Sequence, residues 1–148
     1  MRTIEGVRRS GVAVRPDETI QNAAALMEQA GVGSLAVLDG DELVGIVTDR
    51  DLVRRGLARG LASDARVDGV MSAPVVTISA DSDLHAAFSV FGQHALRRLA
   101  VVERERFVGM ISIDDLLVDL ANDLSALVRP VTAEVLFAHR DSPVPSTA

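Results

Sequence analysis

The chain repeats one motif, Gly45-Ile46-Val47-Thr48-Asp49-Arg50-Asp51-Leu52, which returns as Gly109-Met110-Ile111-Ser112-Ile113-Asp114-Asp115-Leu116. The copies are 64 positions apart, and the same offset holds without a gap back to Asp17 and Asp81. A repeat of this length indicates two copies of one supersecondary unit, each too small to bury its apolar face alone. We therefore expect a pseudo-symmetric pair with a functional cleft between its halves.

Each copy predicts the order strand, helix, strand, strand, helix. Thr19 and Asp83 are equivalent residue types that favour a helix N-cap. Apolar residues follow each cap with the i, i+3, i+4, i+7 spacing of a core-facing helix: Ile20, Ala23, Ala24 and Met27, then Leu84, Ala87, Phe88 and Phe91. We interpret both stripes as core.

A hairpin follows each of these helices. In the first copy, residues 35–38 and 43–47 flank the turn Asp39-Gly40-Asp41-Glu42; in the second, residues 98–102 and 107–111 flank Glu103-Arg104-Glu105-Arg106. The strands are almost continuously apolar, which is typical of strands buried on both faces. The fold class predicted is therefore α/β.

The boundaries follow from the repeat. Ile4-Glu5-Gly6-Val7 resembles Val67-Asp68-Gly69-Val70, so the copies span residues 4–63 and 67–125, with one residue gained before Val75. Residues 126–148 form a C-terminal extension whose end we expect to be disordered. The last helix is expected to end near Leu127 because of Pro130, and residues 133–138 to add one turn or a short strand.

Composition excludes several classes of function. The formal net charge of −6 disfavours nucleic acid and anionic membranes, both of which attract clustered Lys and Arg. The absence of cysteine removes disulfides, thiolate metal sites and a Cys nucleophile. With neither a signal-peptide pattern nor an apolar run of membrane-spanning length, we expect a cytoplasmic protein.

The motif itself has a structural interpretation. Thr48 with Asp51, and Ser112 with Asp115, have the spacing of a capping box at a helix start. In a capping box the hydroxyl accepts from a backbone N–H, and the carboxylate stabilises the positive end of the helix dipole. Its occurrence twice, each time after an apolar strand and beside the expected cleft, favours a second role.

The sequence resembles tandem CBS domains, known as a Bateman module. The resemblance rests on the two motifs and on the segment Asp68-Gly69-Val70-Met71-Ser72-Ala73-Pro74-Val75-Val76-Thr77-Ile78, and it covers residues 4–125. The connector Arg55–Leu61 and the overall size are similar to small stand-alone CBS pairs. The resemblance implies two packed repeats whose clefts often hold adenosine derivatives.

It also implies site residues. Asp51 and Asp115 match the aspartate that binds the ribose hydroxyls, and Thr48 and Ser112 match the neighbouring hydroxyl that contacts ribose or phosphate. The strands that read the adenine edge and cover its ring are matched by Val12 to Val14 and Val76 to Ile78. A hydrogen bond to a charged group contributes about 1.5–3 kcal/mol, so a carboxylate on a diol is a strong contact.

The two copies differ in the basic side chains that could bind a phosphate group. Arg97 and Arg98 stand where nucleotide-binding members often place a basic residue, whereas the first copy has Gly33-Ser34 there. Arg50 is a further candidate, and its counterpart is Asp114. The alternative is that these arginines balance acidic surface charge. The sequence does not determine which of the two clefts contains Arg97 and Arg98.

The chain departs from the family pattern at several places. Gly6-Val7-Arg8-Arg9-Ser10 stands where the first copy often has Asp-Val-Met-Thr, Ala36 and Ala100 replace a usual proline, and Ile113 replaces a polar residue. These departures concern the ligand more than the fold.

We expect no catalytic and no metal-binding residues. His85 and His94 are nine positions apart rather than four, and His139 lies near the end of the chain. Neither a nucleophile elbow nor a phosphate-binding glycine loop occurs.

The sequence thus predicts a non-catalytic regulatory sensor for AMP, ADP, ATP or S-adenosylmethionine that needs no cofactor. As a CBS pair without a catalytic domain it would form a homodimer and signal to a separate, unidentified protein. The alternative is a ligand-free CBS-fold interaction module. Nucleic-acid binding ranks below both, since it rests only on Arg54, Arg55, Arg59 and Arg66.

Overall fold

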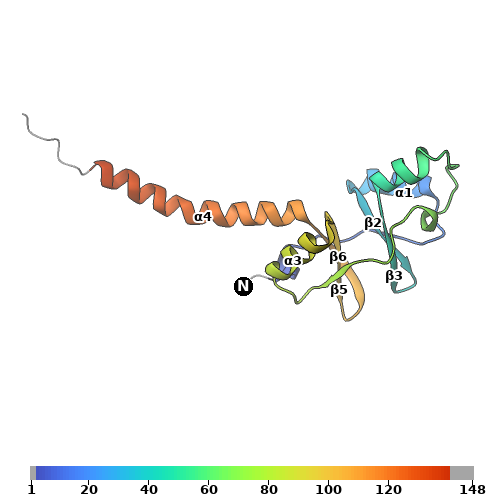
Figure 1. The fold of residues 1–148 in the computed structure, drawn as a ribbon, viewed down its shortest axis with the longest axis horizontal. Coiled ribbons are helices and arrows are strands. Elements are labelled where there is room, and N and C mark those ends of the chain that lie inside the picture. The colour runs from blue at the N-terminus through green and yellow to red at the C-terminus, as the bar shows by residue number, and fades with distance from the viewer. Residues whose placement is uncertain (1–2, 141–148) are drawn as a thin grey trace, which may run out of the picture. The chain divides into compact units, whose positions relative to one another are not determined.

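The structure is a computed structural model that describes residues 3–140, with the backbone alone described for residues 132–140. The chain divides into two compact units, one ending at Ile113 and the other beginning at Asp114. The first unit holds both repeats up to the last strand, and the described part of the second is a single long helix (Figure 1).

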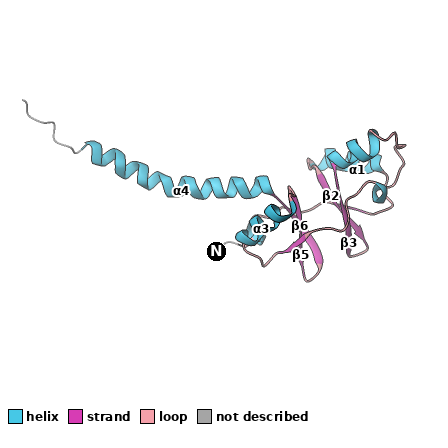
Figure 2. Ribbon diagram, viewed as in Figure 1, coloured by secondary structure: helices cyan, strands magenta, loops and turns pink. Residues whose placement is uncertain are grey.

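The predicted order of elements is confirmed (Figure 2). The first repeat contains β1 (Ala13–Val14), α1 (Ile20–Ala30), β2 (Ser34–Asp39), β3 (Glu42–Thr48), the short helix α2 (Asp49–Asp51) and the π-helix η2 (Leu52–Leu57). The second contains β4 (Thr77–Ser79), α3 (Leu84–His94), β5 (Arg98–Glu103), β6 (Arg106–Ser112) and α4 (Ile113–Arg140). A 3₁₀ turn precedes each repeat, η1 (Ile4–Gly6) and η3 (Val67–Gly69).

The two sheets have the same topology. β1 runs parallel to β2 and β2 antiparallel to β3, and β4, β5 and β6 repeat this arrangement. The register is equivalent as well, since Ala36 pairs with Ile46 as Ala100 pairs with Met110. Each hairpin also shifts register at the same place, after Val37 and after Val101. The fold is therefore an α/β pair of like halves.

Both predicted N-caps are confirmed. Thr19 Oγ1 accepts from the backbone N–H of Asn22 at 3.1 Å, and Asp83 Oδ1 accepts from that of Ala86 at 2.8 Å. α1 ends at Gly31 in the left-handed conformation with φ +64°, which glycine adopts without strain. The equivalent residue after α3 is Ala95, which takes φ +51° despite its Cβ.

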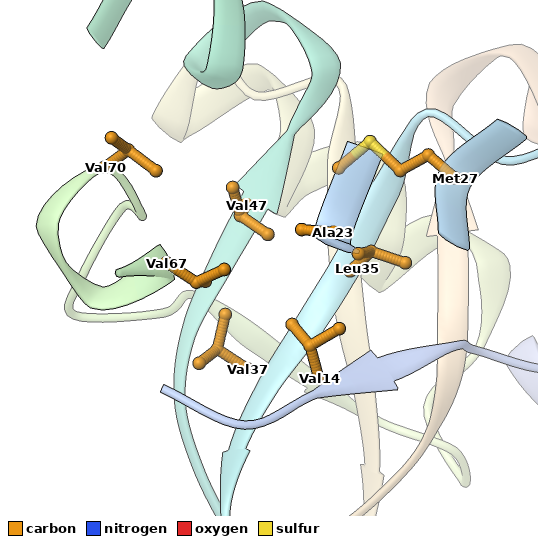
Figure 3. Packing of buried hydrophobic residues seen from close by; sticks show 8 residues of the cluster. All are labelled: Val14, Ala23, Met27, Leu35, Val37, Val47, Val67 and Val70. Atoms are coloured by element: carbon orange, nitrogen blue, oxygen red, sulfur yellow. The ribbon is translucent and has the colours of Figure 1, made fainter. Parts of the chain in front are cut away.

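The core of the first repeat lies between α1 and its sheet (Figure 3). The consecutive residues Leu35, Ala36 and Val37 of β2 are all fully buried. Successive side chains of a strand point to opposite faces, so this confirms that the central strand is covered on both faces. Two members of the cluster, Val67 and Val70, come from the segment that opens the second repeat. The first repeat thus needs part of the second to complete its core.

This exchange is reciprocal. The segment after η3 pairs with β3 through Ser72 and Ile46, while the segment after η1 pairs with β6 through Arg9 and Met110. Arg9 and Ser72 are 63 positions apart, whereas their partners are 64 apart. One residue is therefore gained before Val75, as the sequence predicted.

The prediction that the last helix stops near Leu127 is wrong. α4 continues through Pro130 to Arg140, and residues 133–138 belong to it rather than to a separate turn or strand. A proline inside a helix removes one backbone hydrogen bond and crowds the preceding turn at a cost of about 3 kcal/mol, which a helix of this length tolerates. The tail expected to be disordered lies beyond Arg140, outside the described residues.

Across residues 3–140, no helix combines the length and apolar character needed to span a membrane.

Candidate adenosine-binding clefts

The first candidate motif lies at the junction of β3 and α2. Thr48 Oγ1 accepts from the backbone N–H of Asp51 at 3.1 Å, and Asp51 Oδ2 accepts from that of Thr48 at 3.0 Å. The pair therefore forms the predicted capping box. Both side chains are half-buried, so the hydroxyl and the carboxylate lie at the surface without being fully solvated.

The second motif begins at the equivalent place. Ser112 ends β6, and Asp114 and Asp115 lie in the first turn of α4. The backbone N–H of Ile113 donates to the carbonyl of Arg97 at 2.9 Å, just as that of Asp49 donates to Gly33 at 3.0 Å. At both junctions, the first residue of the helix is therefore hydrogen-bonded to the residue that precedes the paired strand, β2 or β5.

Arg98 crosses from the second repeat to the first. Its backbone begins the central strand β5 and pairs with Ser112 at the end of β6. Its guanidinium Nη2, however, lies only 2.9 Å from the position that a Cβ on Gly33 would occupy, and Asp49 Oδ2 lies 3.2 Å from that position. The structure therefore brings Arg98 to the first-repeat junction that leads into Thr48 and Asp51, a question the sequence left open.

The second junction carries different residues at the equivalent positions. The residue that corresponds to Arg98 is Ser34, which is buried and pairs with Thr48 as Arg98 pairs with Ser112. The residue that corresponds to Asp49 is Ile113. Two junctions with the same backbone pairing thus differ in the charged groups they carry, because the first combines an arginine with an aspartate where the second has a serine and an isoleucine.

A cavity of about 460 Å³ opens beside the first junction, between the C-terminal end of α1 and the start of α2. Gly31, Gly33 and Asp49 line it together with Glu28. Its apolar wall is formed by Ala24, Met27, Val32, Leu52 and Val53. A mixed lining of this kind suits a ligand with an apolar body and a few polar groups.

The remaining candidates differ in accessibility. Arg50 is exposed, and its backbone N–H donates to Asp49 Oδ1 at 2.8 Å. Val12 and Val76 are half-buried at the entrances of β1 and β4, and the carbonyl of Val12 accepts from Ala36 at 3.0 Å. Val14 and Ile78 are buried in the core, so they are placed to support a site rather than to cover a ring.

Sequence reasoning missed two arginines that hold the exchanged segments. Arg8 donates from Nη1 to the carbonyl of Val108 in β6 at 2.6 Å, and from Nε to Glu5 at 2.6 Å. The hydrogen bond from Arg8 lowers the pKa of the Glu5 carboxyl below its ordinary value. Their three-residue separation is a local signal for this pair.

Arg55 holds the other segment. From the π-helix η2 it donates through Nη1 to the carbonyls of Val70 at 3.2 Å and Met71 at 3.0 Å. Its acceptors are backbone carbonyls 15 and 16 positions further along the chain. No side-chain pattern in the sequence identifies such acceptors.

Among the described side chains, no cluster of three or more histidines and carboxylates could hold a metal ion. His85 and His94 are exposed, and the side chain of His139 lies outside the described residues.

Two repeats with exchanged segments and paired polar junctions define a CBS-pair module, and the family comparison agrees. The family model for the CBS domain matches residues 4–58 and 67–122. The chain belongs to the CBS domain family and carries a tandem pair of its repeats.

Individual relatives match most of the chain. The chain is 37% identical over 113 residues to the CBS domain-containing protein YhcV of Bacillus subtilis, covering 76% of this chain and 81% of YhcV. It is 30% identical to a putative signal-transduction protein with CBS domains from Burkholderia ambifaria, with a TM-score of 0.74 over 81% of this chain and 92% of that one.

A more distant structure shares the fold. The CBS domain pair of MJ0100, solved in complex with 5′-methylthioadenosine and S-adenosyl-L-methionine, is 18% identical, with a TM-score of 0.75 over 83% of this chain and 98% of that one.

Proposed function

We propose that this chain is a regulatory CBS pair that binds an adenosine-containing ligand, of the AMP, ADP, ATP or S-adenosylmethionine kind, between its repeats. The observation that carries the proposal is the crossing of Arg98 from the second repeat to Gly33 and Asp49 of the first. An anionic group at this junction would contact both repeats at once. The fold is known to accommodate adenosine derivatives in MJ0100.

Thr48 and Asp51 have the chemistry for a ribose. A carboxylate offers about four lone-pair sites, so the hydrogen bond that Asp51 Oδ2 accepts from the backbone N–H of Thr48 leaves acceptor capacity for a diol. Ser112 and Asp115 would serve the second cleft in the same way. Because Arg98 supplies a guanidinium at the first junction where the second has Ser34, we expect the cleft near Arg98 to bind phosphate-bearing ligands more tightly than the other.

Signalling would then follow from differential binding. A ligand held by Asp51 of one repeat and Arg98 of the other favours the relative placement of repeats in which both contacts form. No catalytic step is part of the proposal. The readout would be made by a separate protein, on a homodimer of the chain.

The competing function is a ligand-free interaction module. The capping box supports it, since Thr48 and Asp51 already stabilise the start of α2 by satisfying each other's backbone N–H groups. On this alternative, the motif needs no ligand to explain it.

A binding screen tests the proposal. Thermal unfolding would be followed with AMP, ADP, ATP and S-adenosylmethionine at about millimolar concentration, with guanosine nucleotides and ribose as controls. A ligand at about 100 times its Kd stabilises the folded chain by about 2.7 kcal/mol, which corresponds to several degrees of Tm.

The variant Arg98→Ser, which installs the residue found at the equivalent Ser34, should weaken a phosphate-bearing ligand by tenfold or more. Arg104→Ser, in the exposed turn of the same hairpin, is the matched control. If no adenosine ligand raises Tm, the sensor proposal is rejected in favour of the interaction module.

A further inference from the structure

We propose that Arg55 is a positioning residue that couples the first motif to the second repeat. It joins the helix that begins at Thr48 and Asp51 to the segment 70–72, which leads into β4. The regulatory meaning of this link rests on the proposed function, because ligand occupancy at the first motif is what the link would transmit. The link itself is defined by the contacts of Arg55.

Arg55 lies in the π-helix η2, which continues directly from the capping box. α2 ends at Asp51, and η2 begins at the next residue. Within η2 the backbone N–H of Ala58 donates to the carbonyl of Val53, five positions earlier, at 2.8 Å. Such π-turns are rare and occur frequently at functional sites. Because no break separates the two helices, a shift at the start of α2 carries Arg55 with it.

The guanidinium of Arg55 contacts three successive residues. Its Nη1 donates to the carbonyls of Val70 at 3.2 Å and Met71 at 3.0 Å, and lies 3.5 Å from Ser72 Oγ. Hydrogen bonds from a charged donor are stronger than neutral ones, and Arg55 is half-buried, which strengthens them further. Arg55 therefore fixes η2 relative to this segment.

The segment 70–72 connects the first repeat to β4. Val70 belongs to the core cluster of the first repeat (Figure 3). Ser72 exchanges backbone hydrogen bonds with Ile46 of β3, at 2.8 and 3.1 Å, and the chain enters β4 at Thr77. β3 ends where α2 begins, at Thr48. The segment is thus held from two sides, by β3 and by η2, and both of these elements lead to the first motif.

The second repeat cannot make the same bond. The 64-position offset places Asp119 where the first repeat has Arg55. An ionised carboxylate accepts hydrogen bonds and has no proton to donate to a carbonyl. The segment exchanged in the other direction is held by Arg8, which donates to the carbonyl of Val108 in a strand. The bond from a helical arginine at this position is therefore a feature of the first repeat.

The link gives ligand binding a route across the module. A ligand that binds Asp51 fixes the start of α2, and the continuous helix and the bonds of Arg55 then restrain the segment 70–72 and the start of β4. This restraint reduces the ordering that a second ligand beside β4 must cause. Coupling between two sites is reciprocal, so we expect positive cooperativity whichever cleft fills first.

The first test needs no ligand. Thr48→Val removes the cap hydroxyl and loosens the start of α2. It should speed amide hydrogen exchange in residues 72–79 about threefold or more relative to α3, whose exchange is the reference for global opening. Arg55→Met keeps an unbranched stem but removes the donors. In that background Thr48→Val should cause no further change.

Two further variants control this comparison. Arg54 is the exposed neighbour of Arg55 on η2, so Arg54→Met loses the same charge and should leave the full effect of Thr48→Val in place. Arg55→Lys retains a charged donor and should restore part of the effect that Arg55→Met abolishes. An equal effect of Thr48→Val in the wild-type and Arg55→Met backgrounds overturns the coupling, and so does the absence of an effect in both.

The second test uses AMP at about millimolar concentration. In Asp115→Asn, which weakens the second motif, AMP should slow exchange in residues 72–79 about threefold. Adding Arg55→Met should abolish this slowing while AMP still raises Tm. Slowing that survives Arg55→Met would come from direct contact of AMP with these residues, and it overturns transmission through Arg55.

The two proposals fail separately. If no adenosine ligand raises Tm, the sensor is rejected, while the comparison of Thr48→Val in the two backgrounds still decides whether Arg55 couples the repeats. If AMP raises Tm without slowing exchange in residues 72–79, the sensor stands and the transmission of ligand occupancy by Arg55 is rejected.

Discussion

The carbonyl oxygen of Arg9 lies directly against Gly109, in the space that a Cβ on that glycine would require. The contact comes from the exchange of segments, since the backbone of Arg9 pairs with Met110 beside this glycine. Gly45 has the equivalent role in the first repeat, where Met71 and Ser72 cross it. The glycine that opens each motif is therefore explained by segment exchange rather than by ligand binding.

Gly109→Ala should destabilise the fold more than Gly45→Ala. At Gly109 the obstacle is backbone, which cannot move without breaking the pairing with Met110. At Gly45 the nearest obstacle is the end of the flexible Met71 side chain, with the carbonyl of Ser72 at 3.2 Å. We expect a loss of about 1–3 kcal/mol for Gly109→Ala in urea unfolding and a smaller one for Gly45→Ala. Gly6→Ala, with open space around it, is the control; equal losses at Gly45 and Gly109 would contradict this account.

Ala95→Gly should stabilise the protein. Ala95 has φ +51°, a conformation that costs a residue with a Cβ roughly 1–2 kcal/mol, and glycine relieves this at some cost in unfolded-chain entropy. We expect a net gain of about 0.5–1 kcal/mol in chemical denaturation. The reverse exchange, Gly31→Ala at the equivalent helix end, should destabilise. A loss of stability in Ala95→Gly would show that the Ala95 methyl group contributes more than the strain costs.

The hairpin turn of the second repeat offers a similar gain. Arg104 and Glu105 both have positive φ, at 50° and 65°, which is the pattern of a type I′ turn and is best met by Asn-Gly. Arg104→Asn/Glu105→Gly should raise the free energy of unfolding by about 1 kcal/mol. In the hairpin turn of the first repeat Gly40 has positive φ and Asp41 does not, so Asp41→Gly should give no gain. A comparable gain from Asp41→Gly would mean that added glycine, rather than turn geometry, is responsible.

Stability should fall in acid partly because of Glu5. Its folded pKa is lowered, chiefly by the hydrogen bond from Arg8, so the contribution is complete above the ordinary pKa of the carboxyl in the unfolded chain. That contribution is lost as the pH falls through the folded pKa, when the carboxylate takes up a proton and the bond to Arg8 weakens. Urea midpoints from pH 6 to pH 3 should therefore decline less steeply in Glu5→Gln than in the wild type. Parallel declines would exclude this pair as a source of acid sensitivity.

The sequence predicted the repeat, the element order, both N-caps and the capping box at Thr48, because each depends on local spacing or on duplication. It could not place Arg98, since the residue that its guanidinium meets, Gly33, lies in the other repeat and carries no side chain to signal the contact. It missed Arg55 for a similar reason, because backbone carbonyls accept its hydrogen bonds. The predicted end of the last helix near Leu127 was too early, because proline disfavours the interior of a helix and this local preference was followed. The long helix on both sides of Pro130 outweighs that preference.

Asp51 can distinguish a helix cap from a ligand contact, because the two roles depend on different properties of its side chain. Asp51→Asn keeps an oxygen that can accept from the N–H of Thr48 but removes the charge. Its free energy of unfolding should therefore stay within about 0.5 kcal/mol of the wild type, whereas Thr48→Val, which loses the cap hydroxyl, should cost about 0.5–2 kcal/mol. For binding, replacing a charged acceptor by a neutral one should weaken an adenosine ligand about tenfold, measured by calorimetry. If Asp51→Asn binds as the wild type does, the carboxylate acts only as a cap and the ribose contact must come from other residues.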